Sequence, residues 1–204
     1  MNYSRNDVTA IILAGGLGRR LNNKNKGLIS LAGKTLIEHI IDRLKPQTPH
    51  IIINANQDLS RYQSLDLPVI EDTFSNNQGP LAGILSCYEH IKTPLVMTIP
   101  CDAPLLPTNL LDTMLKQYLI NNPSQLCVVD DGKRLQNLFM MFHIKQFAHL
   151  EHFYQQNNRK VSDWIESQTY TKVDFSNQES KFININTEKT LSSLINKLNS
   201  DAHE

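Results

Sequence analysis

The stretch from Val8 to Leu28, VTAIILAGGLGRRLNNKNKGL, constrains the fold of this chain more than any other. It begins with an apolar, β-favouring run that breaks off at Ala14-Gly15-Gly16. Because glycine has no Cβ, the backbone that follows such a strand can come close to a ligand. Backbone N–H groups beside basic side chains are the arrangement that a polyphosphate requires. The sequence therefore predicts a buried strand that leads into an anion-binding loop, with basic residues at Arg19, Arg20, Lys24 and Lys26.

Strand and helix patterns alternate through the first part of the chain. The runs 50–55 (HIIINA) and 94–99 (PLVMTI) are continuously apolar, as expected for strands that are covered on both faces. Apolar residues at helical spacing predict helices, the first of which ends before Pro46. The alternation predicts an α/β fold with a mostly parallel, doubly wound sheet. The predicted strands are 8–13, 50–55, 68–71 and 94–99, and the predicted helices are 36–44, 80–91 and 110–118.

Polar residues follow the predicted strands at their carboxyl ends. Gly15 and Gly16 come after the first strand, Asn54 closes the second, and Asp72 and Asp102 follow the third and fourth. Parallel doubly wound sheets bind their ligands at this edge. The sequence thus predicts one binding site to which all four strands contribute.

The second half of the chain has a less regular pattern. Strands are predicted at 126–129 and 138–144 around a turn at 130–133, and later strands at 172–175 and 182–185. Short helices are predicted around 147–154 and 161–165, and Thr187 is expected to cap a closing helix. In the segment FININT, Asn184 and Asn186 alternate with isoleucines, so on a strand both would point to one face. Two amides on one face suit a polar heterocycle or the packing of an edge strand.

Composition narrows the class of protein. The 204 residues are enough for one domain with a sizeable core, and 20 basic residues balance 20 acidic ones. This balance argues against a non-specific nucleic-acid or membrane-surface protein. Three cysteines without a C-x-x-C pair fit buried thiols in a reducing compartment. With no apolar stretch long enough for a signal peptide or a membrane span, we expect a cytoplasmic protein. We also expect a monomer.

Three side chains are candidates for the chemistry. Asp102 fits a Mg²⁺ site, because Mg²⁺ uses one or two carboxylates together with substrate phosphate oxygens; a helix cap or an ion pair is the alternative. Arg20 and Lys26 fit phosphate binding, with solvated loop charges as the alternative. The loop matches neither the Walker A pattern nor G-x-G-x-x-G, so its spacing alone leaves the ligand open. Asn54 and Asp72 suit contacts to a ribose or a base, or bonds to loop backbone.

Several of these segments together resemble one family, the molybdenum cofactor guanylyltransferases. The resemblance implies a single three-layer Rossmann-like domain of the nucleotidyltransferase type over residues 1–204. Residues 1–122 would mainly bind the nucleotide, and residues 123–204 would mainly face molybdopterin. The matching segments are LAGGLGRRL…NKGL (13–28), INAN (53–56), VIEDT (69–73), GPLAG (79–83), PCDAP (100–104), VDFSN (173–177) and FININT (182–187).

The resemblance also implies an activity and roles for residues. It implies transfer of GMP from GTP to the terminal phosphate of molybdenum-molybdopterin, with release of pyrophosphate. Leu13, Ala14 and Gly15 would hold GTP, and Lys26, Asn54 and Asp72 would contact the nucleotide. Asp102 would bind Mg²⁺, Arg20 would assist catalysis, and Asn184 and Asn186 would lie on the pterin side. Transient contacts with cofactor-inserting proteins and recipient molybdoenzymes would follow.

The chain departs from the family pattern in two places. The family loop often reads R-R-M-G-G-x-D-K-G, whereas this chain has Asn22 and Asn23 for the glycines and Asn25 for the aspartate. Asparagine tolerates a positive φ better than most residues, which favours survival of the turn. The segment 135–137 also lacks the His-Pro that is common in the family.

Two other functions stay open at this point. The same fold could use CTP, or act on a sugar phosphate, because base contacts cannot be assigned from the residues alone. A non-catalytic carrier of the pterin cofactor belongs to a different class of protein. Asp102 and Lys26 argue against the carrier, because a carrier has no use for metal-phosphate chemistry.

Overall fold

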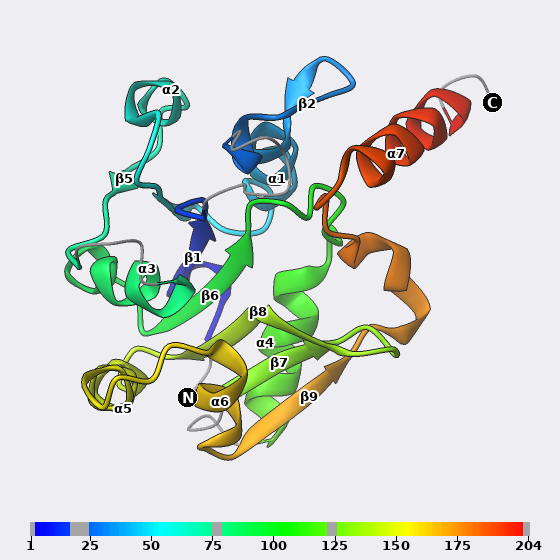
Figure 1. Ribbon diagram of the computed structural model, residues 1–204. Coiled ribbons are helices and arrows are strands. Elements are labelled where there is room, and N and C mark those ends of the chain that lie inside the picture. The colour runs from blue at the N-terminus through cyan, green and yellow to red at the C-terminus, as the bar shows by residue number, and fades with distance from the viewer. Residues whose placement is uncertain (1–2, 17–24, 75–78, 122–125, 202–204) are drawn as a thin grey trace.

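The computed structural model describes residues 3–16, 25–74, 79–121 and 126–201. Within these residues the chain forms a seven-stranded sheet in the order β5-β4-β1-β6-β8-β7-β9 (Figure 1). Neighbouring strands run parallel except β8, which is antiparallel to both β6 and β7. The predicted mostly parallel α/β sheet is confirmed. The strands are β1 (Val8–Leu13), β4 (His50–Asn54), β5 (Val69–Ile70), β6 (Leu95–Pro100), β7 (Leu126–Asp130), β8 (Leu135–His143) and β9 (Tyr170–Asp174).

Helices cover both faces of this sheet, which gives three layers. One face packs against α1 (Leu36–Leu44) and α4 (Leu110–Asn121), which lies behind β7 and β8 in Figure 1. The other face packs against α3 (Pro80–Ser86), α5 (Gln146–Gln155) and α6 (Val161–Glu166). Two hydrophobic clusters therefore lie on opposite sides of the same sheet.

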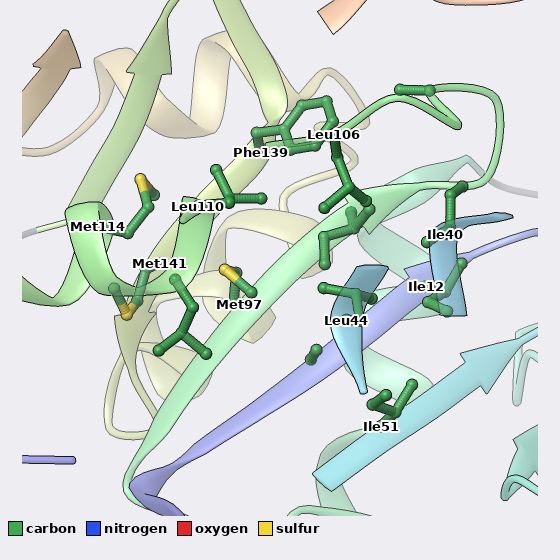
Figure 2. Close-up of a cluster of buried hydrophobic side chains, with 14 of the residues drawn as sticks. Ile12, Ile40, Leu44, Ile51, Met97, Leu106, Leu110, Met114, Phe139 and Met141 are labelled. Carbon is green, nitrogen blue, oxygen red and sulfur yellow. The ribbon is translucent and has the colours of Figure 1, made fainter. Parts of the chain in front are cut away.

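Figure 2 shows one of these clusters, in which strands and helices meet through aliphatic, methionine and phenylalanine side chains. Ile12 and Met97 project from β1 and β6 toward Leu44 of α1 and Leu110 of α4. Each fully buried side chain of this kind contributes about 1.5–3 kcal/mol relative to its exposed state. This burial makes the sheet a rigid base for the loops at its carboxyl edge.

Helix α1 follows the sequence prediction closely. All five apolar positions at helical spacing are buried. Thr35 and Glu38 form a reciprocal capping box at its start, and the helix ends at Leu44, before Pro46. A capping box satisfies backbone N–H groups that the first turn leaves without partners. The buried positions are Leu36, Ile37, Ile40, Ile41 and Leu44.

Helix α3 is shorter than predicted. The sequence favours a helix over 80–91, but α3 ends at Ser86, and a separate 3₁₀ turn spans Tyr88–His90. The Ser86 hydroxyl donates to the carbonyl of Ala82 and accepts the backbone N–H of Thr73. Tyr88 is 45% exposed, although its apolar spacing had suggested a buried position. The end of α3 is thus tied to the loop after β5.

The predicted strand at 182–185 is wrong. A 3₁₀ helix spans Ser176–Phe182, and residues 183–186 form neither helix nor strand and do not belong to the sheet. The backbone N–H of Ile185 donates to the carbonyl of Asp102 at 2.7 Å. This bond attaches the segment to the loop after β6, and Ile185 is fully buried in a small third cluster. Asn184 and Asn186 lie on either side of Ile185 in the sequence, and both line the same pocket.

Smaller elements surround the carboxyl edge of the sheet. They are a hairpin of β2 (Ser30–Leu31) and β3 (Lys34–Thr35), the helix α2 (Leu59–Gln63), and α7 (Glu188–Asp201). The predicted cap of α7 is confirmed, because the Thr187 hydroxyl accepts the backbone N–H of Thr190 at 3.1 Å. Among the described residues, no helix is both long enough and apolar enough to span a membrane.

Candidate active site

A pocket of about 450 Å³ opens at the carboxyl ends of β1, β4 and β6. In the sheet, β4 lies on one side of β1 and β6 lies on the other, so the strand order reverses at β1. Parallel α/β sheets bind ligands at the carboxyl ends of the strands beside such a reversal. Residues from both halves of the chain line the same pocket. They are Leu13, Gly15, Gly16, Lys26, Asn54, Asp72, Gly79, Pro80, Pro100, Cys101, Asp102, Leu138, Asn184 and Asn186.

The backbone after β1 forms one wall of this pocket. A Cβ on Gly15 would lie 2.8 Å from the Asn56 amide nitrogen, whereas a Cβ on Gly16 would meet nothing within 4 Å. Gly15 is therefore required by its neighbours, and Gly16 leaves the wall open. The side chain of Ala14 is buried and does not belong to the pocket lining, so a role in holding the nucleotide stays a prediction. The Ala14 N–H donates to the carbonyl of Asn54 at 2.8 Å, which extends the sheet.

Two amides hold the carboxylate of Asp72. Asn54 donates to one oxygen and Asn56 donates to the other, each at 2.8 Å. The Asn56 side chain also accepts the backbone N–H of Asp72 at 2.8 Å. Hydrogen bonds to an ionised group are stronger than those between neutral groups, so this network fixes the end of β4 to the loop after β5.

Gly83 of α3 makes room for this network. A Cβ at this position would lie 2.1 Å from the Asn54 side-chain oxygen, closer than real Cβ contacts allow. Asn54 is itself almost fully buried, so it cannot swing away into solvent. Glycine at position 83 is thus required for Asn54 to reach Asp72.

Lys26 also lines the pocket. Its Nζ donates to Asp102 Oδ2 at 3.0 Å and to Asn186 Oδ1 at 2.5 Å. Only about a fifth of the Lys26 side chain is exposed, so the ion pair with Asp102 is partly shielded from water. These three residues, which are far apart in the sequence, meet at one ammonium group.

Two buried oxygen atoms of the pocket have no hydrogen-bond partner among the described residues. They are Oδ1 of Asp102 and Oδ1 of Asn184. An unsatisfied buried polar group costs about 1–3 kcal/mol, so its presence in a folded protein points to a ligand that completes it. The described residues contain no group of three or more His, Cys, Asp or Glu side chains that could hold a metal ion. Of the two described carboxylates that line the pocket, Asp72 has both oxygens hydrogen-bonded to amides, so Asp102 is the better candidate for a metal contact.

The three cysteines are free and buried, as predicted. Burial raises the pKa of each thiol to about 12. Cys101 lines the pocket next to Asp102, but at neutral pH its thiol remains protonated and therefore a poor nucleophile. The residues are Cys87, Cys101 and Cys127.

The structure brings most of the predicted site residues to one pocket. Leu13, Gly15, Lys26, Asn54, Asp72, Asp102, Asn184 and Asn186 all line it. Ala14 is not part of the lining, and Arg20 lies outside the described residues. Sequence reasoning missed Asn56, although its two-residue spacing from Asn54 was a usable signal. It also missed Leu138, which reaches the pocket from β8 without any motif of its own.

A parallel sheet whose glycine loop, lysine and carboxylates meet at the carboxyl edge defines a nucleotide-binding α/β protein. A comparison with protein families makes the assignment specific. Residues 10–173 match the model of the MobA-like NTP transferase domain, and the chain belongs to this family.

Relatives of similar length support the assignment. A molybdenum cofactor guanylyltransferase of Shewanella piezotolerans is 39% identical over 180 residues, which cover 88% of each chain. A molybdenum cofactor guanylyltransferase of Shewanella sp. MR-4 is 34% identical over 192 residues, covering 94% of this chain and 97% of the relative.

Solved structures show the same fold at low identity. Molybdopterin-guanine dinucleotide biosynthesis protein A from Archaeoglobus fulgidus has a TM-score of 0.76 and 20% identity, covering 95% of this chain and 99% of its own. The 4-diphosphocytidyl-2C-methyl-D-erythritol synthase from Anaerococcus prevotii has a TM-score of 0.72 and 15% identity, covering 96% of this chain and 97% of its own. The expected nucleotidyltransferase fold is confirmed.

Proposed function

We propose that this protein transfers GMP from GTP to the terminal phosphate of molybdenum-molybdopterin, forming the guanine dinucleotide cofactor and pyrophosphate. The names of the curated relatives support this choice of substrates. The observation that carries it is the meeting of Lys26, Asp102 and Asn186 at the pocket edge, beside a buried carboxylate oxygen without a partner.

The chemistry of the reaction explains this set of residues. The attacking group is the oxygen of a phosphate monoester, which is largely ionised at neutral pH. The reaction therefore needs no general base, and the pocket lining contains no histidine among the described residues. What the protein supplies is the alignment of two anions and the shielding of charge at the α-phosphate and the leaving pyrophosphate. Lys26 provides a positive charge for this purpose.

The unpartnered oxygen of Asp102 fits a Mg²⁺ ion, because Mg²⁺ binds through carboxylate and phosphate oxygens and keeps several waters. When bound, the ion would supply charge neutralisation for the transferred phosphoryl group. Asp102 would hold it with one oxygen while the other stays on Lys26. Lys26 in turn is held by Asn186 and would face the phosphates of the nucleotide.

The remaining pocket residues divide between the two substrates in this proposal. The backbone of Gly15 and Gly16 approaches the phosphates of GTP, and Asp72, fixed by its two asparagines, contacts the nucleoside. Asn184 has a free amide oxygen for the donors of the pterin. Arg20, which lies outside the described residues, is proposed to bind a phosphate group, because a guanidinium can bind phosphate through two N–H groups. That the protein acts as a cytoplasmic monomer, passing its product to recipient molybdoenzymes, remains a prediction.

Pyrophosphate release tests the proposal. The purified protein is incubated with GTP, Mg²⁺ and molybdenum-molybdopterin, and pyrophosphate is measured with and without the pterin. We expect release only when both substrates are present. No release from a folded protein that binds the pterin would favour the carrier function instead.

Base choice is tested separately by calorimetry with GTP, CTP, ATP and UTP in the presence of Mg²⁺. We expect GTP to bind most tightly. Tight binding of CTP without binding of GTP would instead assign the protein to cytidylyl transfer, which a structurally similar protein carries out according to its name.

A further inference from the structure

Asn25 immediately precedes Lys26 and takes part in an unusual set of contacts. It caps the short 3₁₀ helix Lys26–Leu28, and its carbonyl accepts the N–H of Leu28 at 3.1 Å. Its side-chain oxygen accepts the hydroxyl of Tyr62 at 2.5 Å. Its side-chain nitrogen donates to Asp58 Oδ2 at 3.1 Å and to the carbonyl of Gln57 at 3.5 Å. Tyr62 belongs to α2, and Gln57 and Asp58 come directly before this helix, so α2 and its N-terminal approach hold the Asn25 side chain at three points.

The chemistry of these partners suits an amide at position 25. Tyr62 is fully buried, and burial raises the pKa of its hydroxyl, so this group is a proton donor throughout the physiological range. It therefore needs an acceptor, whereas the exposed carboxylate of Asp58 can accept a hydrogen bond from a donor at position 25. Asparagine supplies both from one side chain. An aspartate at position 25 would still accept from Tyr62, but it would set a second negative charge against Asp58.

The backbone next to Lys26 is fixed on its other side as well. Gly27 lies against Tyr62 and Cys101, because a Cβ on Gly27 would be 2.6 Å from the Tyr62 hydroxyl and 3.5 Å from the Cys101 Cβ. Cys101 immediately precedes Asp102, the partner of Lys26. Residues 25 and 27 are thus held against α2 and the loop after β6, and Lys26 lies between them.

We propose that Asn25 is a positioning residue, which together with Tyr62 and Asp58 holds the backbone of Lys26 so that its ammonium group meets Asp102. This inference rests on the proposed function, in which Lys26 faces the nucleotide phosphates. It assigns no contact with substrate to Asn25, Tyr62 or Asp58.

An exchange of the two side chains tests the inference. In Asn25→Asp, two carboxylates face each other, and we expect kcat to fall by at least about tenfold, because displacing a catalytic group by about 1 Å can cost about a hundredfold. In the double variant with Asp58→Asn, the carboxylate at position 25 accepts from both Tyr62 and the new amide. We expect the kcat of this variant to return to within about threefold of the wild-type value, because the hydrogen bond between residues 25 and 58 is restored with donor and acceptor exchanged. Asparagine also tolerates the left-handed backbone of residue 58, where φ is 51°.

Asp66→Asn is the matched control. It makes the same chemical change near the other end of α2, at a residue with φ of 57°. We expect wild-type kcat for this variant in the same pyrophosphate assay. All variants are checked by thermal unfolding, and kcat is measured well below the lowest midpoint.

A double-mutant cycle that combines Asn25→Asp with Lys26→Ala separates an effect on the position of Lys26 from an effect on the stability of the protein. GTP affinity is measured by calorimetry, which does not need turnover. If Asn25 acts through Lys26, Asn25→Asp weakens GTP binding in the wild-type background and changes it less than about twofold in the Lys26→Ala background.

The outcomes are distinguishable. Wild-type kcat in Asn25→Asp, a double variant as slow as Asn25→Asp, or a loss explained by the unfolded fraction would each overturn the inference. Equal weakening of GTP binding with and without the Lys26 side chain would overturn it too. A wild-type protein that binds GTP but releases no pyrophosphate would instead refute the proposed function, and the cycle in GTP affinity would still decide the role of Asn25.

Discussion

Two partly or fully buried carboxylates in this protein have opposite surroundings. Asp131, in the turn between β7 and β8, has both oxygens occupied: one accepts the backbone N–H groups of Lys133 and Arg134 at 2.9 and 2.8 Å, and the other accepts from Gln136 at 2.6 Å. Asp102, after β6, has one oxygen on Lys26 and one buried oxygen that finds no partner in the described part of the chain. Both side chains follow a strand of the same sheet.

The difference separates a carboxylate that stabilises the fold from one that is available for function. Satisfied buried charges contribute to stability through their hydrogen bonds, whereas an unsatisfied oxygen lowers stability. The turn at Asp131 is complete without a ligand, but the edge at Asp102 is not. The following variants test this contrast.

The largest effect is expected for Asp102→Ala. Loss of its carboxylate removes the proposed Mg²⁺ contact and the partner of Lys26, so GMP transfer should fall by at least about 10³-fold. The thermal midpoint should stay near the wild-type value, because the variant also removes an unsatisfied oxygen. Turnover is measured by pyrophosphate release and stability by calorimetry. Wild-type turnover in the folded variant would refute the role of Asp102.

Asp131→Ala should show the opposite pattern. It leaves three donors without their acceptor and should lower the free energy of unfolding by about 1–3 kcal/mol. Turnover per folded molecule should not change, because Asp131 does not line the pocket. Urea unfolding monitored by circular dichroism measures the first effect. An Asp131→Ala variant with unchanged stability but slower turnover would contradict the assignment of a structural role to Asp131.

Gly83→Ala tests the packing that supports the pocket. The added methyl group would displace Asn54, which should weaken GTP binding by about tenfold and lower stability by about 1–3 kcal/mol. Gly33→Ala is the comparison, because a Cβ there meets nothing within 4 Å, although its φ of 85° makes alanine strained. Calorimetry should therefore find a loss of GTP affinity only in the first variant; equal affinity in both would contradict this role of Gly83.

The smallest effect is a pH dependence of stability that comes from Asp131. Burial acts to raise the pKa of Asp131, but the hydrogen bonds from Gln136 and from the backbone of the turn outweigh it, and the net pKa is lowered. Its contribution is therefore fully present above the unfolded pKa of about 4 and is lost as pH falls through the lower folded pKa. The difference in unfolding free energy between wild type and Asp131→Ala should shrink accordingly below pH ~4. A difference that stays constant down to pH ~2 would contradict this.

Much of the fold could be predicted from the sequence, because continuous apolar runs and helical spacing follow directly from burial on two faces of a sheet. The rule that parallel sheets bind ligands at the carboxyl ends of their strands predicted that Asn54, Asp72 and Asp102 share one edge. The sequence could not predict that 183–186 would lie outside the sheet, since the backbone of Ile185 bonds to the loop after β6 and not to a neighbouring strand. Asn184 and Asn186 nevertheless line the same pocket.

The contacts of Asn25 illustrate what sequence patterns leave out. The sequence shows only that an asparagine stands where the family often has aspartate. The partners of this side chain, Tyr62 and Asp58, lie more than 30 residues away and match no motif. Pairwise contacts between loops and short helices depend on tertiary packing, which periodicity does not encode.

The most direct test of the central claim is the effect of Mg²⁺ on GTP binding to the wild type and to Asp102→Asn, measured by calorimetry. Asparagine keeps the shape of the side chain but removes its charge. We expect Mg²⁺ to raise GTP affinity in the wild type by at least about tenfold and to have little effect in the variant, because one carboxylate carries the site. An equal increase in both proteins would contradict the assignment of Asp102 and its unpartnered oxygen to the metal.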